Sequence, residues 1–206
     1  MDLKETIRAA LAVHQRKPMD PGPVPAAVLV PLFFRDGEYH VLFTKRTEHL
    51  QHHRGEISFP GGVRSPEDSS ALDTALRETG EEIGLARDSV EILGTLDDFY
   101  SIHNYLVTPY VGVFPASSKL EINRDEIDRL ICVPLSHLLR PEIFRVEDWA
   151  WKGRTHPVFF YRYRDDEVWG LTAAILKQLL DIVFGGGMTA TGQGNPAADR
   201  GQGIHV

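Results

Sequence analysis

The chain has 206 residues, of which 42% are hydrophobic, and its formal net charge is −7. These values predict one domain with a full core, and the acidic balance argues against a nucleic-acid duplex as a partner. The sequence has no apolar run near the roughly 18 residues that span a membrane, no apolar signal region and a single cysteine, Cys132. We therefore expect a cytoplasmic protein that has no internal disulfide and does not bind membranes.

The N-terminal part of the chain is predicted to form a helix, a linker and a β-hairpin. Apolar residues at helical spacing predict a helix over residues 3–15, and four prolines predict an extended linker over residues 17–25. A continuous apolar run predicts a strand over residues 26–34, with Pro31 at a sheet edge or bulge. An Arg-Asp-Gly turn then returns the chain as a strand over residues 39–45.

Further along the chain, short apolar or alternating runs predict more strands. These strands lie over residues 55–59, 90–100, 105–114, 130–133, 143–151 and 158–163. Apolar spacing also predicts a helix that ends at Gly84, a helical turn over residues 135–139 and a C-terminal helix over residues 171–184. This order of elements is typical of a mixed α+β domain with one charged helix in its middle.

Composition divides the chain into three parts. Residues 1–25 are the N-terminal helix and linker, and residues 26–184 are the folded domain. Residues 185–206 are a glycine-rich tail, which we expect to be disordered.

The helix that leads to Gly84 has an apolar face and an acidic face. Its apolar stripe consists of residues at helical spacing: Leu72, Ala75, Leu76, Thr79 and Ile83. Glu78, Glu81 and Glu82 crowd together on another face, near the C-terminal end, where the helix dipole is already negative. This placement costs on the order of 1 kcal/mol, and a bound divalent cation would reverse its sign. The alternative interpretation is a solvated acidic face.

The loop before this helix carries the other half of the signal. The helix is capped by Ser65, or it begins a few residues later, near Asp68 or Ser69. Gly61 and Gly62 precede the loop, and glycine lets a backbone approach a ligand closely. Glutamates beside an exposed glycine backbone suit a hard cation, Mg2+ or Mn2+, and a phosphate group. The pattern favours metal-assisted attack of water on a phosphoanhydride.

This segment resembles the Nudix box, G-x5-E-x7-R-E-U-x-E-E-x-G-U, in which U is a bulky apolar residue. The residues that match its second half in register are Arg77, Glu78, Glu81, Glu82, Gly84 and Leu85. Thr79 stands at a bulky position of the box, and the loop holds one extra residue. The first glutamate of the box then corresponds to Asp68 or Ser69, of which only Asp68 is acidic. The alternative for Asp68 is a charge in the first helical turn.

A second stretch, residues 42–62, resembles the signature of the coenzyme A pyrophosphatase subfamily, L-L-T-x-R-[SA]-x3-R-x3-G-x3-F-P-G-G. The residues that agree are Leu42, Thr44, Arg46, Gly55, Phe59, Pro60, Gly61 and Gly62. Phe43, Thr47 and Gln51 differ, while the spacing is kept. Further segments that look similar lie at residues 107–112, 123–127, 133–135 and 169–173, the last of which reads WGLTA. The resemblance covers residues 26–184, which it identifies as a Nudix hydrolase domain.

The resemblance implies a Nudix-type α/β/α sandwich with a mixed sheet and a central loop-helix-loop catalytic motif. It also implies a divalent metal cofactor, Mg2+ or Mn2+. The implied metal ligands are Glu78, Glu81, Glu82 and the carbonyl of Gly61. Arg77 would orient Glu81, its neighbour four residues on, and Glu81 and Glu82 would take part in catalysis.

Outside the box, the resemblance implies further site residues. Glu126, on a loop before a strand, would act as a metal ligand or base; the alternative is an ordinary loop acid. Arg46 and Arg54 would neutralise phosphates. Gly55 and Gly62 would let the backbone approach the substrate closely.

The implied reaction is attack of water on one phosphorus of the diphosphate of coenzyme A or a derivative. Its products would be 4′-phosphopantetheine and adenosine 3′,5′-bisphosphate. The alternatives are another nucleoside diphosphate derivative (ADP-ribose, NADH or a dinucleoside polyphosphate) and a Nudix fold that serves as a non-catalytic ligand-binding module. We also expect a homodimer, with the N-terminal helix or the hairpin over residues 143–163 as its contact surface.

Histidines and tryptophans give no separate site in the sequence. His49, His52, His53 and His103 lack the spacing of a zinc site. We expect Trp149, Trp151 and Trp169 in the core or at an interface rather than as a platform that stacks on adenine.

Overall fold

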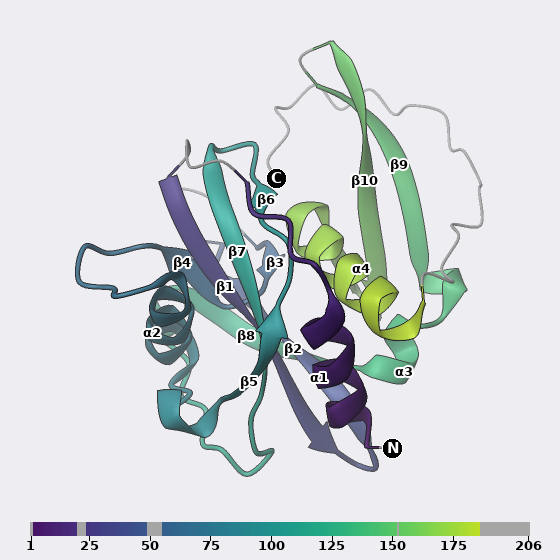
Figure 1. Cartoon of the computed structure of the whole chain (residues 1–206). Coiled ribbons are helices and arrows are strands. Elements are labelled where there is room, and N and C mark those ends of the chain that lie inside the picture. The colour runs from purple at the N-terminus through teal and green to yellow at the C-terminus, as the bar shows by residue number, and fades with distance from the viewer. Residues whose placement is uncertain (1, 20–23, 49–54, 152, 186–206) are drawn as a thin grey trace.

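The structure is a computed structural model that describes residues 2–19, 24–48, 55–151 and 153–185 (Figure 1). The described α-helices are α1 Leu3–Val13, α2 Ala71–Ile83, α3 Leu135–Leu138 and α4 Gly170–Phe184. The described strands are β1 Val24–Arg35, β2 Glu38–Arg46, β3 Ile57–Ser58, β4 Gly61–Val63, β5 Glu91–Thr95, β6 Phe99–Tyr100, β7 Tyr105–Val113, β8 Ile127–Pro134, β9 Phe144–Trp151, β10 Arg154–Tyr163 and β11 Asp166–Trp169. The predicted tail lies outside these residues, apart from Gly185.

A mixed sheet forms the centre of the molecule. Its strands follow the order β3-β2-β1-β7-β5, and β4, β6 and β8 pair with β1, β7 and β2, respectively. Strand β1 runs parallel to β7 and antiparallel to β2 and β4. A second, antiparallel sheet has the order β11-β10-β9. The fold is therefore mixed α+β, as predicted.

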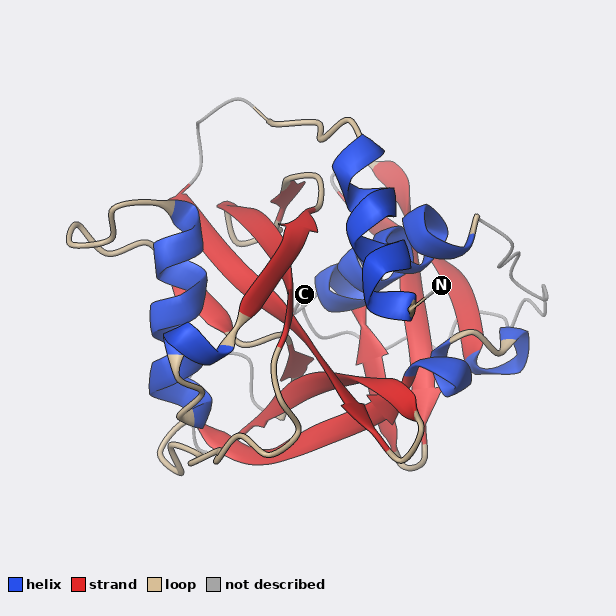
Figure 2. Cartoon of the chain, turned by 60° about the horizontal axis from the view of Figure 1, so that its bottom comes forward, coloured by secondary structure: helices blue, strands red, loops and turns tan. Residues whose placement is uncertain are grey.

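Helices cover both faces of the central sheet (Figures 1 and 2). Helix α2 packs against β1, β4 and β7, while α1 contacts β5 and α4, and α4 packs on β10 and β11. Leu29 and Phe33 of β1 belong to the cluster under α2, whereas Val30 and Leu32 belong to the core on the opposite face. Because both faces of β1 are covered, its apolar run is continuous. This layering confirms the predicted α/β/α sandwich.

The predicted place of Pro31 at a sheet edge or bulge is wrong, because β1 is a central strand. On one side Pro31 pairs in register with Gly112 of β7. On the other side β4 pairs with β1 only up to Val28, and β2 pairs only from Leu32. Pro31 lies in the gap between these two partners, where its missing N–H breaks no ladder hydrogen bond.

Helix α2 begins later than a Ser65 cap would place it. The N-cap is Ser70, whose hydroxyl accepts a hydrogen bond from the backbone N–H of Asp73 at 3.1 Å. The N–H of Ser65 instead donates to the carboxylate of Asp68 at 2.8 Å. Asp68 therefore closes the loop before the helix, and the Ser65 cap and the first-turn interpretation of Asp68 are both wrong.

Two short strands are absent from the sequence-based prediction, and one predicted strand is divided. Strands β4 and β11 have three and four residues, too few to show a clear period of two, so their pairing depends on tertiary contacts. The strand predicted over residues 90–100 is divided into β5 and β6.

Two smaller sequence-based expectations concern the membrane and the cysteine. Within the described residues, no helix is long and apolar enough to cross a lipid bilayer. Cys132 is free and half-buried in β8, and burial raises the pKa of its thiol. The thiol therefore behaves as a small apolar group rather than as a nucleophile.

Candidate active site

The apolar face of α2 fixes the direction of its glutamates. Ala75, Leu76 and Ile83 are buried in the molecule. Gly84 ends the helix with a φ of 68°, in the left-handed region that glycine adopts without strain. The helix also packs against β4, so the glycines that precede the loop lie beside its acidic face.

The two glycines of β4 let this strand approach β1 on one side and the Glu78 side chain of α2 on the other. A Cβ atom at Gly61 would lie 2.6 Å from the Cα of Val28 in β1. A Cβ atom at Gly62 would lie 2.6 Å from Oε1 of Glu78 in α2. Strand β4 can therefore bring its backbone against a glutamate of α2 only because both positions are glycine.

Glu82 is a buried carboxylate with one unpaired oxygen. Its side chain is 4% exposed, and its Oε1 accepts a hydrogen bond from Nη1 of Arg46 at 3.4 Å, whereas Oε2 has no hydrogen-bond partner. Burial raises the pKa of Glu82 to about 8 despite the neighbouring charge of Arg46. The nearby charges of Glu78 and Glu126 raise this pKa further. Burial therefore outweighs the attraction of Arg46, and a further positive charge would stabilise the ionised form of Glu82.

Arg46 links two of these acids and has an unused donor. Its Nη2 lies 3.7 Å from Oε2 of Glu126, whose side chain is 45% exposed. Its Nε is buried and has no hydrogen-bond partner. Buried polar groups are normally paired, so a free N–H donor beside the free oxygen of Glu82 is the pattern of a site that binds an anion and a cation.

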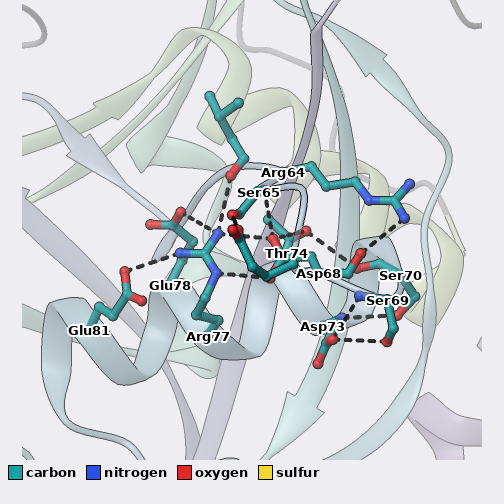
Figure 3. Close-up of polar contacts among 12 residues, drawn as sticks. Arg64, Ser65, Asp68, Ser69, Ser70, Asp73, Thr74, Arg77, Glu78 and Glu81 are labelled. Carbon is teal, nitrogen blue, oxygen red and sulfur yellow. Dashed lines mark hydrogen bonds and ion pairs between the residues drawn. The ribbon is translucent and has the colours of Figure 1, made fainter.

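Arg77 binds four oxygen groups at the start of the acidic face (Figure 3). Its Nε and Nη2 donate to the two carboxylate oxygens of Asp68 at 2.9 and 3.0 Å. Its other contacts are Glu78 at 2.9 Å, Glu81 at 3.1 Å and the carbonyl of Val63 at 3.2 Å. These contacts connect the loop, β4 and α2 through one planar guanidinium group.

Asp68 is the anchor of this network. It also accepts hydrogen bonds from the N–H of Ser65 and the hydroxyl of Thr74, at 2.8 and 2.9 Å. The hydrogen bonds from Arg77, the largest cause, hold the pKa of Asp68 far below its usual range. Asp68 is therefore ionised, and both its oxygens are used within the protein.

A cavity of about 310 Å³ opens beside the glycines. It is lined by Arg46, Phe59, Gly61 and Gly62 of the stretch that resembles the coenzyme A signature. Tyr105 of β7 contributes to a lining in which most side chains are apolar. A mostly apolar pocket with a few charged groups at one place is the usual form of a small-molecule site.

The acidic residues suit a divalent cation, although the arginines now hold them. Among the described residues, no three His, Cys, Asp or Glu side chains are already grouped closely enough to hold a metal ion. Burial raises the pKa of Glu78, as it does that of Glu82; the charges of Glu81 and Glu126 raise the pKa of Glu78 further, and the charge of Glu78 raises that of Glu82. A free buried oxygen and hard carboxylate donors fit Mg2+ or Mn2+.

The structure brings most of the predicted site residues together, with three exceptions. Glu81 is more than half exposed and contacts only the outer side of Arg77 among the interactions described. Gly55 has a φ of 64°, lies against Glu48 and is not among the residues that line the cavity. Arg54 lies outside the described residues, as do His49, His52 and His53.

Sequence reasoning missed two features of the site. It treated Asp68 as the first acid of the Nudix box or as a helix charge, whereas the structure makes it the partner of Arg77. It placed Trp169 in the core or at an interface, whereas Trp169 lines the cavity together with Leu171. The WGLTA segment was the available signal for Trp169.

A family model and curated relatives give the same family assignment for this chain. A model of the NUDIX domain matches residues 23–166. A relative from Photorhabdus laumondii, described as an uncharacterized Nudix hydrolase NudL, is 40% identical over 77% of this chain and 84% of its own length. A protein of the same description from Yersinia enterocolitica is 39% identical over 77% of this chain and 80% of its own. A MutT/nudix family protein from Enterococcus faecalis has a TM-score of 0.49 and 16% identity, over 89% of this chain and 80% of its own.

Proposed function

We propose that this chain, which belongs to the Nudix family, hydrolyses the diphosphate bond of coenzyme A or its derivatives. Nudix hydrolases act on nucleoside diphosphate derivatives and use divalent metal ions. The products would be 4′-phosphopantetheine and adenosine 3′,5′-bisphosphate. The choice of coenzyme A is the part of the proposal that extends beyond the family.

One observation carries the proposal: two neighbouring side chains carry a buried acceptor atom and a buried donor atom that have no hydrogen-bond partner. Oε2 of Glu82 and Nε of Arg46 are both buried without hydrogen-bond partners. The same two side chains contact each other through Oε1 and Nη1 at 3.4 Å. Leaving such groups unpaired costs about 1–3 kcal/mol each, so we infer that a cation and a phosphate oxygen are their partners.

The proposed ligands of Mg2+ or Mn2+ are Glu78, Glu81, Glu82 and the carbonyl of Gly61. A bound divalent ion would neutralise the diphosphate and make a bound water more acidic. Arg77 holds Glu78 and Glu81 in place through its ion pairs. We assign Arg46 to a phosphate oxygen through its free Nε. Glu126, half-exposed beside Arg46, is our candidate to accept the proton of the attacking water.

The assignment of coenzyme A is supported by the residues around the cavity. Four of the residues that agree with the signature line it, and so do residues of the WGLTA segment. The stretches that resemble the subfamily therefore meet at one cavity beside the glutamates, although they are more than 100 residues apart in sequence. This convergence is what a substrate-selecting surface requires.

The test is turnover of a substrate panel by the full chain. The protein is incubated with Mg2+ or Mn2+ and with coenzyme A, ADP-ribose, NADH or diadenosine polyphosphates, and the products are separated by chromatography. We expect coenzyme A to be cleaved fastest, into the two products named above. Faster cleavage of ADP-ribose or NADH would contradict the coenzyme A assignment, and no turnover of any compound would contradict an enzymatic function.

Matched variants connect the activity to the site. Glu82→Gln removes the proposed ligand with little change in volume. Glu91→Gln makes the same change at the surface, where Glu91 pairs with Lys4 at 3.2 Å. We expect Glu82→Gln to lose activity and Glu91→Gln to retain it; full activity of Glu82→Gln would exclude the proposed metal role of Glu82.

A further inference from the structure

The junction between β11 and α4 forms one wall of the cavity. Trp169, Leu171 and Ile175 line the cavity, although they lie beyond residue 166, where the match to the family model ends. Gly170 between them has a φ of 63°, a conformation that glycine adopts without strain. The chain can therefore turn directly from strand into helix and place both neighbours of Gly170 on the cavity. This wall belongs to a part of the chain outside the matched domain.

The position of Trp169 is fixed from behind by other aromatic rings. Phe160 stacks on it with an interplanar angle of 9° and 6.2 Å between ring centroids. Trp149 lies 5.8 Å from it, and the guanidinium of Arg145 lies 3.9 Å from the centre of the Phe160 ring. A side chain held in this way forms a preformed surface, which need not be ordered when a ligand binds.

Most of the other side chains that line the cavity are apolar too, although Ser58, Ser101 and His103 also line it. The apolar ones include Val28 of β1, Phe59 before β4 and Val107 of β7. Arg46 and the glycines line the same cavity, so the apolar space begins next to the place where we assign the diphosphate. A group that enters this space must lose its water, which favours an apolar group over a sugar with several hydroxyls.

We propose that Trp169 and Leu171 form a specificity wall, which selects substrates whose arm beyond the diphosphate ends in an apolar group. The occupant that fits best is the acyl chain that a pantetheine arm carries on its sulfur. The identity of this arm rests on the proposed function. Affinity should rise by about fourfold for each added acyl methylene until the cavity is full, because each buried methylene adds hydrophobic stabilisation.

The test separates binding from turnover. Isothermal titration calorimetry without metal measures the binding of S-acetyl-, S-butyryl- and S-hexanoyl-pantetheine, which carry no phosphate, to the full chain. We expect Trp169→Ala and Leu171→Ala each to weaken the binding of the hexanoyl compound by about tenfold. Trp169→Phe should lose only part of this affinity. The matched control is Phe34→Ala, which removes an exposed aromatic side chain of β1 that neither lines the cavity nor belongs to the aromatic cluster around Trp169.

In turnover, the wall should act on KM. We expect Trp169→Ala to raise the KM for hexanoyl-coenzyme A by about tenfold with kcat little changed, and to leave the KM for ADP-ribose within about twofold. Circular dichroism of each variant checks that it is folded.

Three results would overturn the inference: no binding of acyl-pantetheine by the unchanged protein, no dependence on chain length, or equal losses in Trp169→Ala and Phe34→Ala. Binding that depends on Trp169, together with no hydrolysis of any diphosphate, would overturn the proposed function but support the specificity wall. Hydrolysis of coenzyme A compounds that does not change in Trp169→Ala would support the proposed function but overturn the specificity wall.

Discussion

At the scale of single residues, the charge at the centre of the site is not balanced by the protein alone. Glu82 has a free, buried oxygen, and its pKa is raised from the ordinary value of 4.5 to about 8 by burial. Asp68 has the opposite environment, since hydrogen bonds from Arg77 lower its pKa. Two acids of one motif thus differ in protonation because one is paired within the protein and the other faces the proposed cation site.

The raised pKa of Glu82 predicts how stability depends on pH without metal. The unfolded chain loses the Glu82 proton near pH 4.5, whereas the folded protein keeps it up to about pH 8. In this interval the folded state binds more protons, so the contribution of Glu82 to stability falls as the pH rises. In EDTA, we expect Glu82→Gln to be on the order of 1–3 kcal/mol more stable than the unchanged protein at pH 8, with little difference near pH 4.5.

Urea unfolding in EDTA at pH 5 and pH 8 measures this effect, and added Mg2+ completes the test. Mg2+ at pH 8 should stabilise the unchanged protein and not Glu82→Gln, because only a carboxylate binds the ion strongly. Equal stabilisation of both proteins by Mg2+ would mean that Glu82 is not a ligand.

Arg77 gives a second prediction at this scale, because its planar guanidinium group contacts several carboxylates at once. Lysine keeps the charge but cannot donate two parallel hydrogen bonds to Asp68 while it reaches Glu78 and Glu81. We expect Arg77→Lys to lower kcat by about 10- to 100-fold, the usual effect of losing a group that orients metal ligands. Steady-state kinetics over a range of Mg2+ concentrations measures this loss; a kcat within twofold of the unchanged protein would contradict the positioning role.

At the scale of elements, the site depends on β4, a strand of three residues. Gly61 pairs with Val28 and Gly62 with Ala27, so β4 connects the central strand β1 to α2. The sequence shows the glycines, but not that they form a strand. Their close approach to β1 and to Glu78 arises only when β4 packs between β1 and α2.

Replacement by alanine should reduce stability at Gly61 and activity at Gly62. At Gly61 the new Cβ meets the backbone of β1, which cannot move aside, so we expect a loss of about 1–3 kcal/mol in unfolding free energy. At Gly62 it meets the flexible end of Glu78, so the fold should persist while Glu78 is displaced. For Gly62→Ala we expect kcat to fall by about 100-fold with a nearly unchanged Tm.

Calorimetry and initial rates on both variants separate the two effects. A Gly62→Ala protein that unfolds early but keeps its kcat would contradict the proposed contact with Glu78.

At the scale of the whole molecule, the N-terminal segment is fastened to the sheet and to α4. His14 pairs with Asp97 at 2.8 Å, and Gln178 of α4 donates to the same carboxylate at 2.6 Å. Ile7 and Leu11 of α1 are buried in the main core. Residues from both ends of the described chain therefore pack together at one place.

Asp98 provides a test of this fastening. It is 4% exposed and accepts hydrogen bonds from Arg16, from the hydroxyl of Thr108 and from the N–H of Met19, at 2.7, 2.7 and 3.2 Å. Asp98→Ala leaves these donors unpaired, so we expect a loss of about 2–4 kcal/mol in unfolding free energy. Urea unfolding measures it, with the exposed Asp128→Ala as control; equal stability of the two variants would contradict the role of Asp98.

The homodimer stays a prediction, and the fold favours one of its two candidate surfaces. The apolar residues Ile7 and Leu11 of α1 are used within its own domain. Strands β9 and β10 extend beyond the rest of the molecule (Figure 1). We therefore predict that the β9–β10 hairpin forms the contact. Light scattering coupled to gel filtration should give twice the mass of one chain, and a monomer mass would contradict this prediction.

The sequence by itself determined the parts of this protein that depend on neighbours along the chain. The apolar stripe of α2, its acidic face and its stop at Gly84 follow from helical spacing and glycine conformation. Spacing also identified the motif of the family and most of the residues that meet at the site. The helix start was less certain, because Ser65, Ser69 and Ser70 are all able to cap a helix.

Only the tertiary structure decided the features that depend on contacts distant in sequence. Glu82 and Asp68 are both acids of one motif, and their opposite pKa shifts arise from burial beside Arg46 in one case and from pairing with Arg77 in the other. Trp169 became part of the cavity because β11, which ends at Trp169, packs against β3 of the central sheet. Burial, dielectric environment and hydrogen-bond partners are properties of the packed chain, so no local pattern in the sequence contains them.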